Sequence, residues 1–121
     1  MSTSFTPILS HTLEHTPGAL AAIFADADGE AVDSVSTRLQ PDDLLVLGAH
    51  YGVLLSMMRS GLTRFALGRP EEILIHHSRT DVLIREVGDG YYVVLALDSG
   101  SHLATAQRRL DSCAAALRKE M

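Results

Sequence analysis

The chain has 121 residues, 46% of them hydrophobic, which is enough to bury one core of ordinary size. Its net charge of −5 argues against general nucleic-acid binding, because that function needs a basic surface. A single cysteine, Cys113, excludes an internal disulfide and a cysteine-only metal site, and it favours a reducing compartment. We therefore expect one domain over residues 1–121 that does not bind nucleic acid.

The first half of the chain predicts a helix followed by two strands. Phe5, Leu9 and Leu13 repeat at helical spacing near the N-terminus. The segment ALAAIFA at 19–25 has no polar residue, so this strand should be covered on both faces. The turn DADG then leads into a mixed, half-exposed strand at 30–36.

The second half predicts a long helix, three strands and a closing helix. The helix covers 41–67 and has two aspartates at the positive end of its dipole. Strands at 71–77, 81–87 and 91–97 follow, joined by the short turns SRT and GDG. The last helix begins near Ser101. The fold class is α+β, in the order α-β-β-α-β-β-β-α.

No segment predicts a secretory signal or a membrane span. The N-terminus, MSTSFTPILSHT, has no lysine or arginine ahead of a hydrophobic stretch. The most apolar segment, from Leu44 to Met58, is shorter than the roughly 20 residues needed to cross a bilayer. We expect a cytoplasmic protein without a membrane partner.

The segment HTLEH at 11–15 fits H-x-x-E-H, the inverted zinc-protease signature. A catalytic zinc usually needs a third protein ligand and a cleft, and no other histidine stands in a ligand pattern. The apolar stripe of this helix is offset from His11 and His15, so both should face solvent. We predict no metal site, and the metallohydrolase stays only as a weak alternative.

The other motifs predict no catalytic or cofactor site either. There is no phosphate-binding loop and no nucleophile motif. DADG lacks the glutamate of a calcium loop, since Thr37 stands at that place. Cys113 lies on the apolar stripe of the last helix, where it is expected to be an inert hydrophobe. We expect a protein that is not an enzyme and has no cofactor.

The central helix predicts a second covered surface. Its sheet-facing side should carry the large apolar residues Leu44, Leu47, Tyr51, Leu54, Leu55, Met58, Leu62 and Phe65. The opposite side is expected to hold a row of small residues with apolar neighbours, namely Gly48, Gly52, Ser56 and Ser60 with Leu45, Ala49 and Val53. A helix that is apolar almost all round is covered on both sides. We interpret this side as a two-fold dimer interface. Packing against the chain's own terminal helices is the alternative.

The strand at 71–77 supports the dimer. It begins with two acids and ends with two histidines, so it should lie at the edge of the sheet. An apolar edge carrying Ile73 and Ile75 is an aggregation hazard unless it is paired or covered. Pairing with its own copy beside the helix pair would remove that hazard.

The order of elements resembles the Roadblock family (the dynein light-chain-like domain), especially its short bacterial MglB-type members. The resemblance covers nearly the whole chain. It rests on PGALAAIFADADGEAVDSVS at 17–36, on the small residues of the helix 43–67, and on the segment 73–110 with the closing helix.

The resemblance implies a five-stranded antiparallel sheet flanked by helices, related to the profilin and longin folds. It also implies dimers made through the second helix and the third strand. Family members bind or regulate small Ras-like GTPases, or act as scaffolds, and some stimulate GTP hydrolysis in a partner without a nucleotide site of their own.

We therefore expect a homodimeric, non-enzymatic module that regulates or scaffolds a small Ras-like GTPase. Exposed candidates for contact with that partner are Arg79, Arg108 and Arg109. The alternative is a small-molecule sensor with a pocket between sheet and helix. We expect large side chains to fill that space, namely Phe24, Tyr51, Met58 and Phe65.

Overall fold

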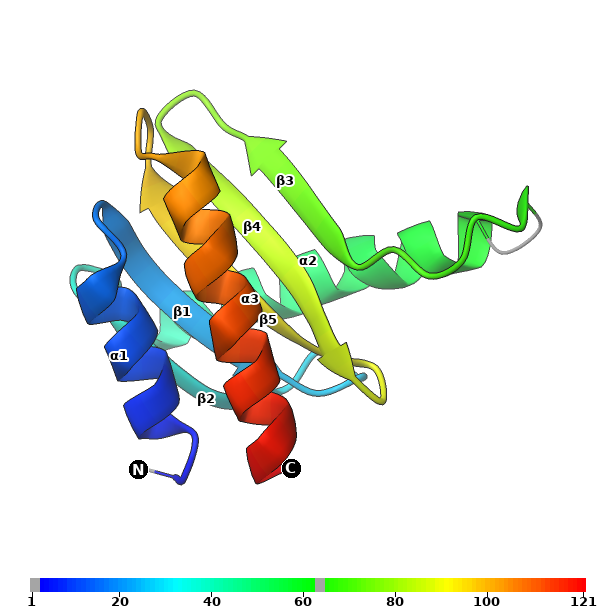
Figure 1. Cartoon of the computed structure of the whole chain (residues 1–121), viewed down its shortest axis with the longest axis horizontal. Coiled ribbons are helices and arrows are strands. Elements are labelled where there is room, and N and C mark those ends of the chain that lie inside the picture. The colour runs from blue at the N-terminus through cyan, green and yellow to red at the C-terminus, as the bar shows by residue number, and fades with distance from the viewer. Residues whose placement is uncertain (1–2, 63–64) are drawn as a thin grey trace.

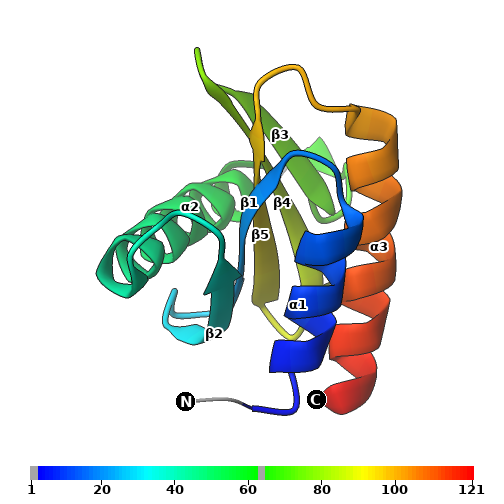
Figure 2. The same cartoon turned by 90° about the vertical axis from the view of Figure 1, so that its left-hand side faces the viewer.

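The computed structural model describes residues 3–62 and 65–121. Its elements are α1 (Thr6–His15), β1 (Ala19–Ala25), β2 (Ala31–Ser36), α2 (Pro41–Leu62), β3 (Glu72–His76), β4 (Thr80–Gly88), β5 (Tyr91–Asp98) and α3 (Leu103–Glu120). The strands form one antiparallel sheet in the order β2-β1-β5-β4-β3. Helices α1 and α3 cover one face, and α2 crosses the other (Figures 1 and 2). The predicted fold class and element order are confirmed.

The sheet separates two apolar clusters, because successive side chains of a strand point to opposite faces. In β1, Phe24 joins the cluster under α1 and α3, while Ile23 joins the cluster under α2. The ring of Phe24 meets that of Phe5, from the segment before α1, with centroids 4.9 Å apart. Strand β1 is thus covered on both faces, as its uniformly apolar sequence predicted.

The turns between strands follow their residue types. The carboxylate of Asp26 accepts hydrogen bonds from the amides of Asp28 and Glu30, at 2.9 and 3.0 Å. Gly29 closes this turn with a φ of +86°, which favours glycine. The DADG segment is therefore a turn between β1 and β2.

Helix α2 is shorter than predicted. It ends at Leu62 instead of 67, and residues 63–64 of the expected helix lie outside the described residues. Ala66 has a φ of +54°, a left-handed conformation that cannot continue a right-handed helix. The C-terminal end of α2 projects past the edge of the sheet (Figure 1).

Candidate functional site

Helix α2 contacts the sheet through a narrow stripe. Its buried residues are Leu44, Gly48, Tyr51 and Leu55. Three of these are large apolar residues that were predicted on this side, and that part of the prediction is confirmed. The presence of Gly48 in the stripe was not predicted.

Gly48 and Gly52 of α2 face the sheet, so the prediction that these two glycines lie opposite it is wrong. A Cβ added to Gly52 would lie 2.0 Å from the hydroxyl oxygen of Tyr92. A Cβ added to Gly48 would lie 3.0 Å from Cγ2 of Ile23. The glycines therefore make room for β1 and β5 beneath the helix.

The outer side of α2 is apolar and exposed. Leu45 is 50% exposed, Val53 62%, Met57 66% and Val46 69%. The smaller residues Ala49, Ser56 and Ser60 lie beside them, and none of the three is buried. Since α1 and α3 lie on the other face of the sheet, they do not cover this surface (Figure 2). The alternative in which the terminal helices pack on it is wrong.

Strand β3 is at the edge of the sheet, as predicted, and pairs only with β4 among the described strands. Ile73 and Ile75 are half-buried against the cluster under α2. Leu74 points to the other face and is 38% exposed. Ile73 and Ile75 thus point to the same side of the sheet as α2.

The candidate arginines are not gathered on one surface. Arg79 lies in the turn between β3 and β4. On α3, Arg108 lies beside Glu72 and Asp111, whereas Arg109 faces the groove between α3 and α1. The structure therefore gives no single cationic patch made of all three residues.

The histidines of HTLEH are exposed on α1, as predicted. Their rings stack with centroids 4.0 Å apart, and Nδ1 of His15 donates to the carbonyl oxygen of His11 at 2.9 Å. Within residues 3–62 and 65–121, no three histidine, cysteine or acidic side chains are grouped as a metal site.

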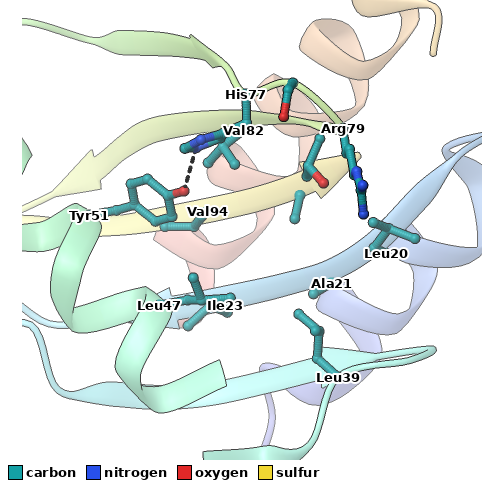
Figure 3. Close-up of a pocket in the computed structure, with 13 residues that line it drawn as sticks. Leu20, Ala21, Ile23, Leu39, Leu47, Tyr51, His77, Arg79, Val82 and Val94 are labelled. Atoms are coloured by element: carbon teal, nitrogen blue, oxygen red, sulfur yellow. Dashed lines mark hydrogen bonds between the residues drawn. The ribbon is translucent and has the colours of Figure 1, made fainter. Parts of the chain in front are cut away.

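Two other histidines are fixed at the end of β3, and no local pattern indicated their partners. Nδ1 of His76 donates to the buried carboxylate of Asp81 at 2.6 Å, on the α3 side. Nε2 of His77 lies 2.9 Å from the hydroxyl of Tyr51, on the α2 side (Figure 3). The Tyr51–His77 contact ties α2 to the β3–β4 turn.

Burial changes the acidity of three side chains. It raises the pKa of the Tyr51 hydroxyl and that of the Cys113 thiol, because the charged form loses hydration. Burial also raises the pKa of Tyr92, and the charge of Asp26 adds to this, while Arg59 opposes it. The Cys113 thiol is thus held in its less reactive protonated form.

None of the helices in the described part of the chain is long and apolar enough to cross a membrane. Three features of the described surface stand out, namely the exposed side of α2, the β3 edge, and a pocket beneath α2.

The sheet order, with two helices on one face and one on the other, is that of the Roadblock fold. The Roadblock/LC7 domain from Streptomyces avermitilis matches with a TM-score of 0.86 and 18% identity, covering 93% of this chain and 93% of that one. The gliding protein MglB from Thermus thermophilus matches with a TM-score of 0.86 and 18% identity, covering 98% of this chain and 92% of that one.

A further MglB structure, described as a tetrameric arrangement, has a TM-score of 0.87 and 19% identity, covering 98% of this chain and 91% of that one. No family profile matches the sequence. No curated protein matches it either. The structural likeness establishes the fold that the sequence resemblance predicted.

Proposed function

We propose that the chain forms a two-fold homodimer through the outer side of α2 and the edge of β3. The observation that carries this is the exposed apolar surface of Leu45, Val46, Val53 and Met57 on one helix. Contiguous apolar surface of this kind marks an interaction site in a soluble protein. The tetrameric arrangement of one MglB structure supports self-association on this fold.

Gly48 and Gly52 face the sheet and take no part in this dimer, but the other small residues of α2 still fit it. Ala49, Val53, Ser56 and Ser60 follow at spacings of four, three and four, so they form one ridge on α2. Small side chains on either side of Val53 let a second helix approach closely. A two-fold axis near Val53 would bring each ridge against its copy.

Edge pairing would extend the same interface. No described strand pairs with the outer side of β3, where the backbone groups of an edge strand are open to pairing, and β3 follows the end of α2 in the chain. A second copy of β3 would satisfy those groups. Ile73 and Ile75 would then continue the apolar surface of α2 across the interface.

The proposed role of the dimer is to bind and regulate, or scaffold, a small Ras-like GTPase in the cytoplasm, with no chemistry of its own. Support comes from the Roadblock fold shared with MglB and from the sequence resemblance. The dimer would act by biasing the ordered state of the partner's switch loops. Arg79, Arg108 and Arg109 remain candidate contacts on different surfaces.

The test is GTP hydrolysis by the small Ras-like GTPases of the source organism, purified and loaded with GTP. We expect one of them to bind the chain and to change its single-turnover rate in a saturable way. Val53→Glu should remove the effect if the dimer is the active form, while the chain alone should bind no GTP in calorimetry. Failure of every such GTPase to bind would reject the regulatory role.

A second candidate function, small-molecule sensing, is favoured by a pocket between α2 and the sheet. The expectation that large side chains fill this space is wrong. Phe24 lies on the opposite face, and Met58 and Phe65 are 37% and 54% exposed. Of the four residues named, only Tyr51 lines the pocket.

A further inference from the structure

A pocket of about 360 Å³ lies beneath the N-terminal half of α2, beside the β3–β4 turn (Figure 3). This volume is in the range of sites that hold small organic molecules. The pocket is open on one side. Its walls come from the sheet, from α2, and from the segments before α2 and after β3.

The deep part of the pocket is apolar. Ile23, Val82 and Val94 form its floor on β1, β4 and β5, and Leu47 and Leu39 close it from the α2 side. Two further sheet residues in the lining are only alanines, Ala21 and Ala96, which leaves the space unfilled. An aliphatic chain bound here would remove this apolar surface from water, which is favourable by about 25 cal/mol of free energy per Å² buried.

The rim of the pocket is polar at one end. The turn supplies Ser78, Arg79 and Thr80, and the Tyr51–His77 hydrogen bond stands next to them. The side chain of Arg79 extends from the turn toward Leu20 (Figure 3). The lining contains this one permanent charge and no acidic residue.

Arg79 is free to bind an anion. No ion pair among the described residues includes it. The carboxylate of Asp81, two residues along, is held by His76 on the other face of the sheet. A guanidinium group can bind a carboxylate by donating two parallel hydrogen bonds. Ser78 and Thr80 add hydroxyl donors close by.

We propose that this pocket binds a small aliphatic monocarboxylate, with its chain against Ile23, Val82 and Val94 and its carboxylate on Arg79. This deepens the second candidate function and is independent of the GTPase proposal. A single cation favours a single negative charge over a di- or triphosphate. The pocket volume of about 360 Å³ has room for a chain of medium length.

The test uses octanoate as the probe, followed by amide NMR shifts and by calorimetry. We expect saturable shifts confined to residues around the pocket. Octan-1-ol has the same chain without the charge and should bind about tenfold more weakly or worse, because a charge-assisted hydrogen bond is lost. Arg79→Ala should weaken octanoate binding to a similar extent.

Matched variants separate the pocket from nonspecific effects. Arg108→Ala removes an exposed arginine on the far side of the sheet and should leave binding unchanged. Ala96→Leu places a larger side chain in the cavity and should abolish binding of both probes. If that variant fails to fold, the surface substitution Arg79→Ala and the alcohol still decide the question.

Three results would overturn the proposal. Equal binding of octanoate and octan-1-ol would remove the role of Arg79, and shifts on the outer side of α2 would place the site elsewhere. No saturable binding, with pocket amides that instead change with protein concentration, would show that a second copy fills the space. None of these results decides the GTPase proposal, which the hydrolysis assay tests separately.

Discussion

The hydroxyl of Tyr92 donates a hydrogen bond of 2.7 Å to the carbonyl oxygen of Gly48. This contact joins β5 to the middle of α2 through the buried cluster on that face. It also explains why Gly52 lacks a side chain, since the same hydroxyl occupies the place of its Cβ. The hydrogen bond of Tyr92 and the missing side chain of Gly52 together allow α2 to pack closely on the sheet.

Gly52→Ala should destabilise the protein. Replacing glycine by alanine inside a helix stabilises it by about 1 kcal/mol, but overpacking typically destabilises a protein by about 1–3 kcal/mol. The new Cβ would lie 2.0 Å from the Tyr92 hydroxyl oxygen and 2.8 Å from Cζ, so the clash should exceed the gain. Urea unfolding gives the sign directly.

Gly61→Ala is the matched control on the same helix. Nothing described lies within 4 Å of a Cβ at Gly61, so this substitution should stabilise by about 0.5–1 kcal/mol. Adding Tyr92→Phe to Gly52→Ala should recover part of the loss, because the nearest clashing atom is gone. A Gly52→Ala variant as stable as Gly61→Ala would contradict this placement of Tyr92.

Tyr92→Phe should lower stability at neutral pH by about 1 kcal/mol, the usual net value of a lost hydrogen bond. It should also flatten the alkaline pH dependence. The folded pKa of Tyr92 is raised above 10.0, so its contribution is present below that pH and is lost as pH rises through the folded value. Unfolding series up to about pH 11 measure the slope. An unchanged alkaline slope would exclude Tyr92 as its source, and any remainder belongs in part to Tyr51, whose pKa is also raised.

Val53→Glu should dissociate the proposed dimer. The residue is 62% exposed in the single chain, so the change should hardly affect folding. At the dimer interface it would bury an unpaired charge, which costs several kcal/mol and weakens association by about a hundredfold or more. Sedimentation across a concentration series measures this. Ala115→Glu, at an exposed position on α3, should leave association unchanged. A wild-type chain that sediments as a monomer near 13.1 kDa would reject the dimer.

Protein purified without a histidine tag should carry no bound zinc. His11 and His15 lie on an exposed helix face, and the Nδ1 of His15 is already engaged with a carbonyl oxygen. Elemental analysis measures the metal content. One equivalent of zinc that disappears when both histidines become alanine would restore the metallohydrolase alternative.

The sheet and its order of elements were predictable from strand composition. ALAAIFA carries apolar residues at every position, so only a covered central strand suits it. Among the described strands, EILIH pairs only with β4, and its polar ends had predicted this edge position. In these segments the local pattern and the tertiary packing agree.

The sheet-facing side of α2 was predictable only in part. Leu44, Tyr51 and Leu55 were assigned to it correctly, and helical spacing also places Gly48 there, four residues after Leu44, although the prediction put it on the opposite side. Small residues are compatible with a close partner on either side. Gly52 faces the sheet because it lies against Tyr92. Tyr92 is far from Gly52 in the chain, so no local sequence pattern indicates this contact.

The overhang of α2 beyond the sheet separates two selective pressures along one helix. Leu44 and Tyr51 are buried on the sheet, whereas Met57 is exposed and a Cβ added at Gly61 would have nothing described within 4 Å. In a mutational scan, substitutions at the first pair should reduce cellular abundance. Substitutions at Met57 should leave abundance intact and alter only phenotypes that require assembly. A single helix would thus report on folding at one set of positions and on quaternary structure at another.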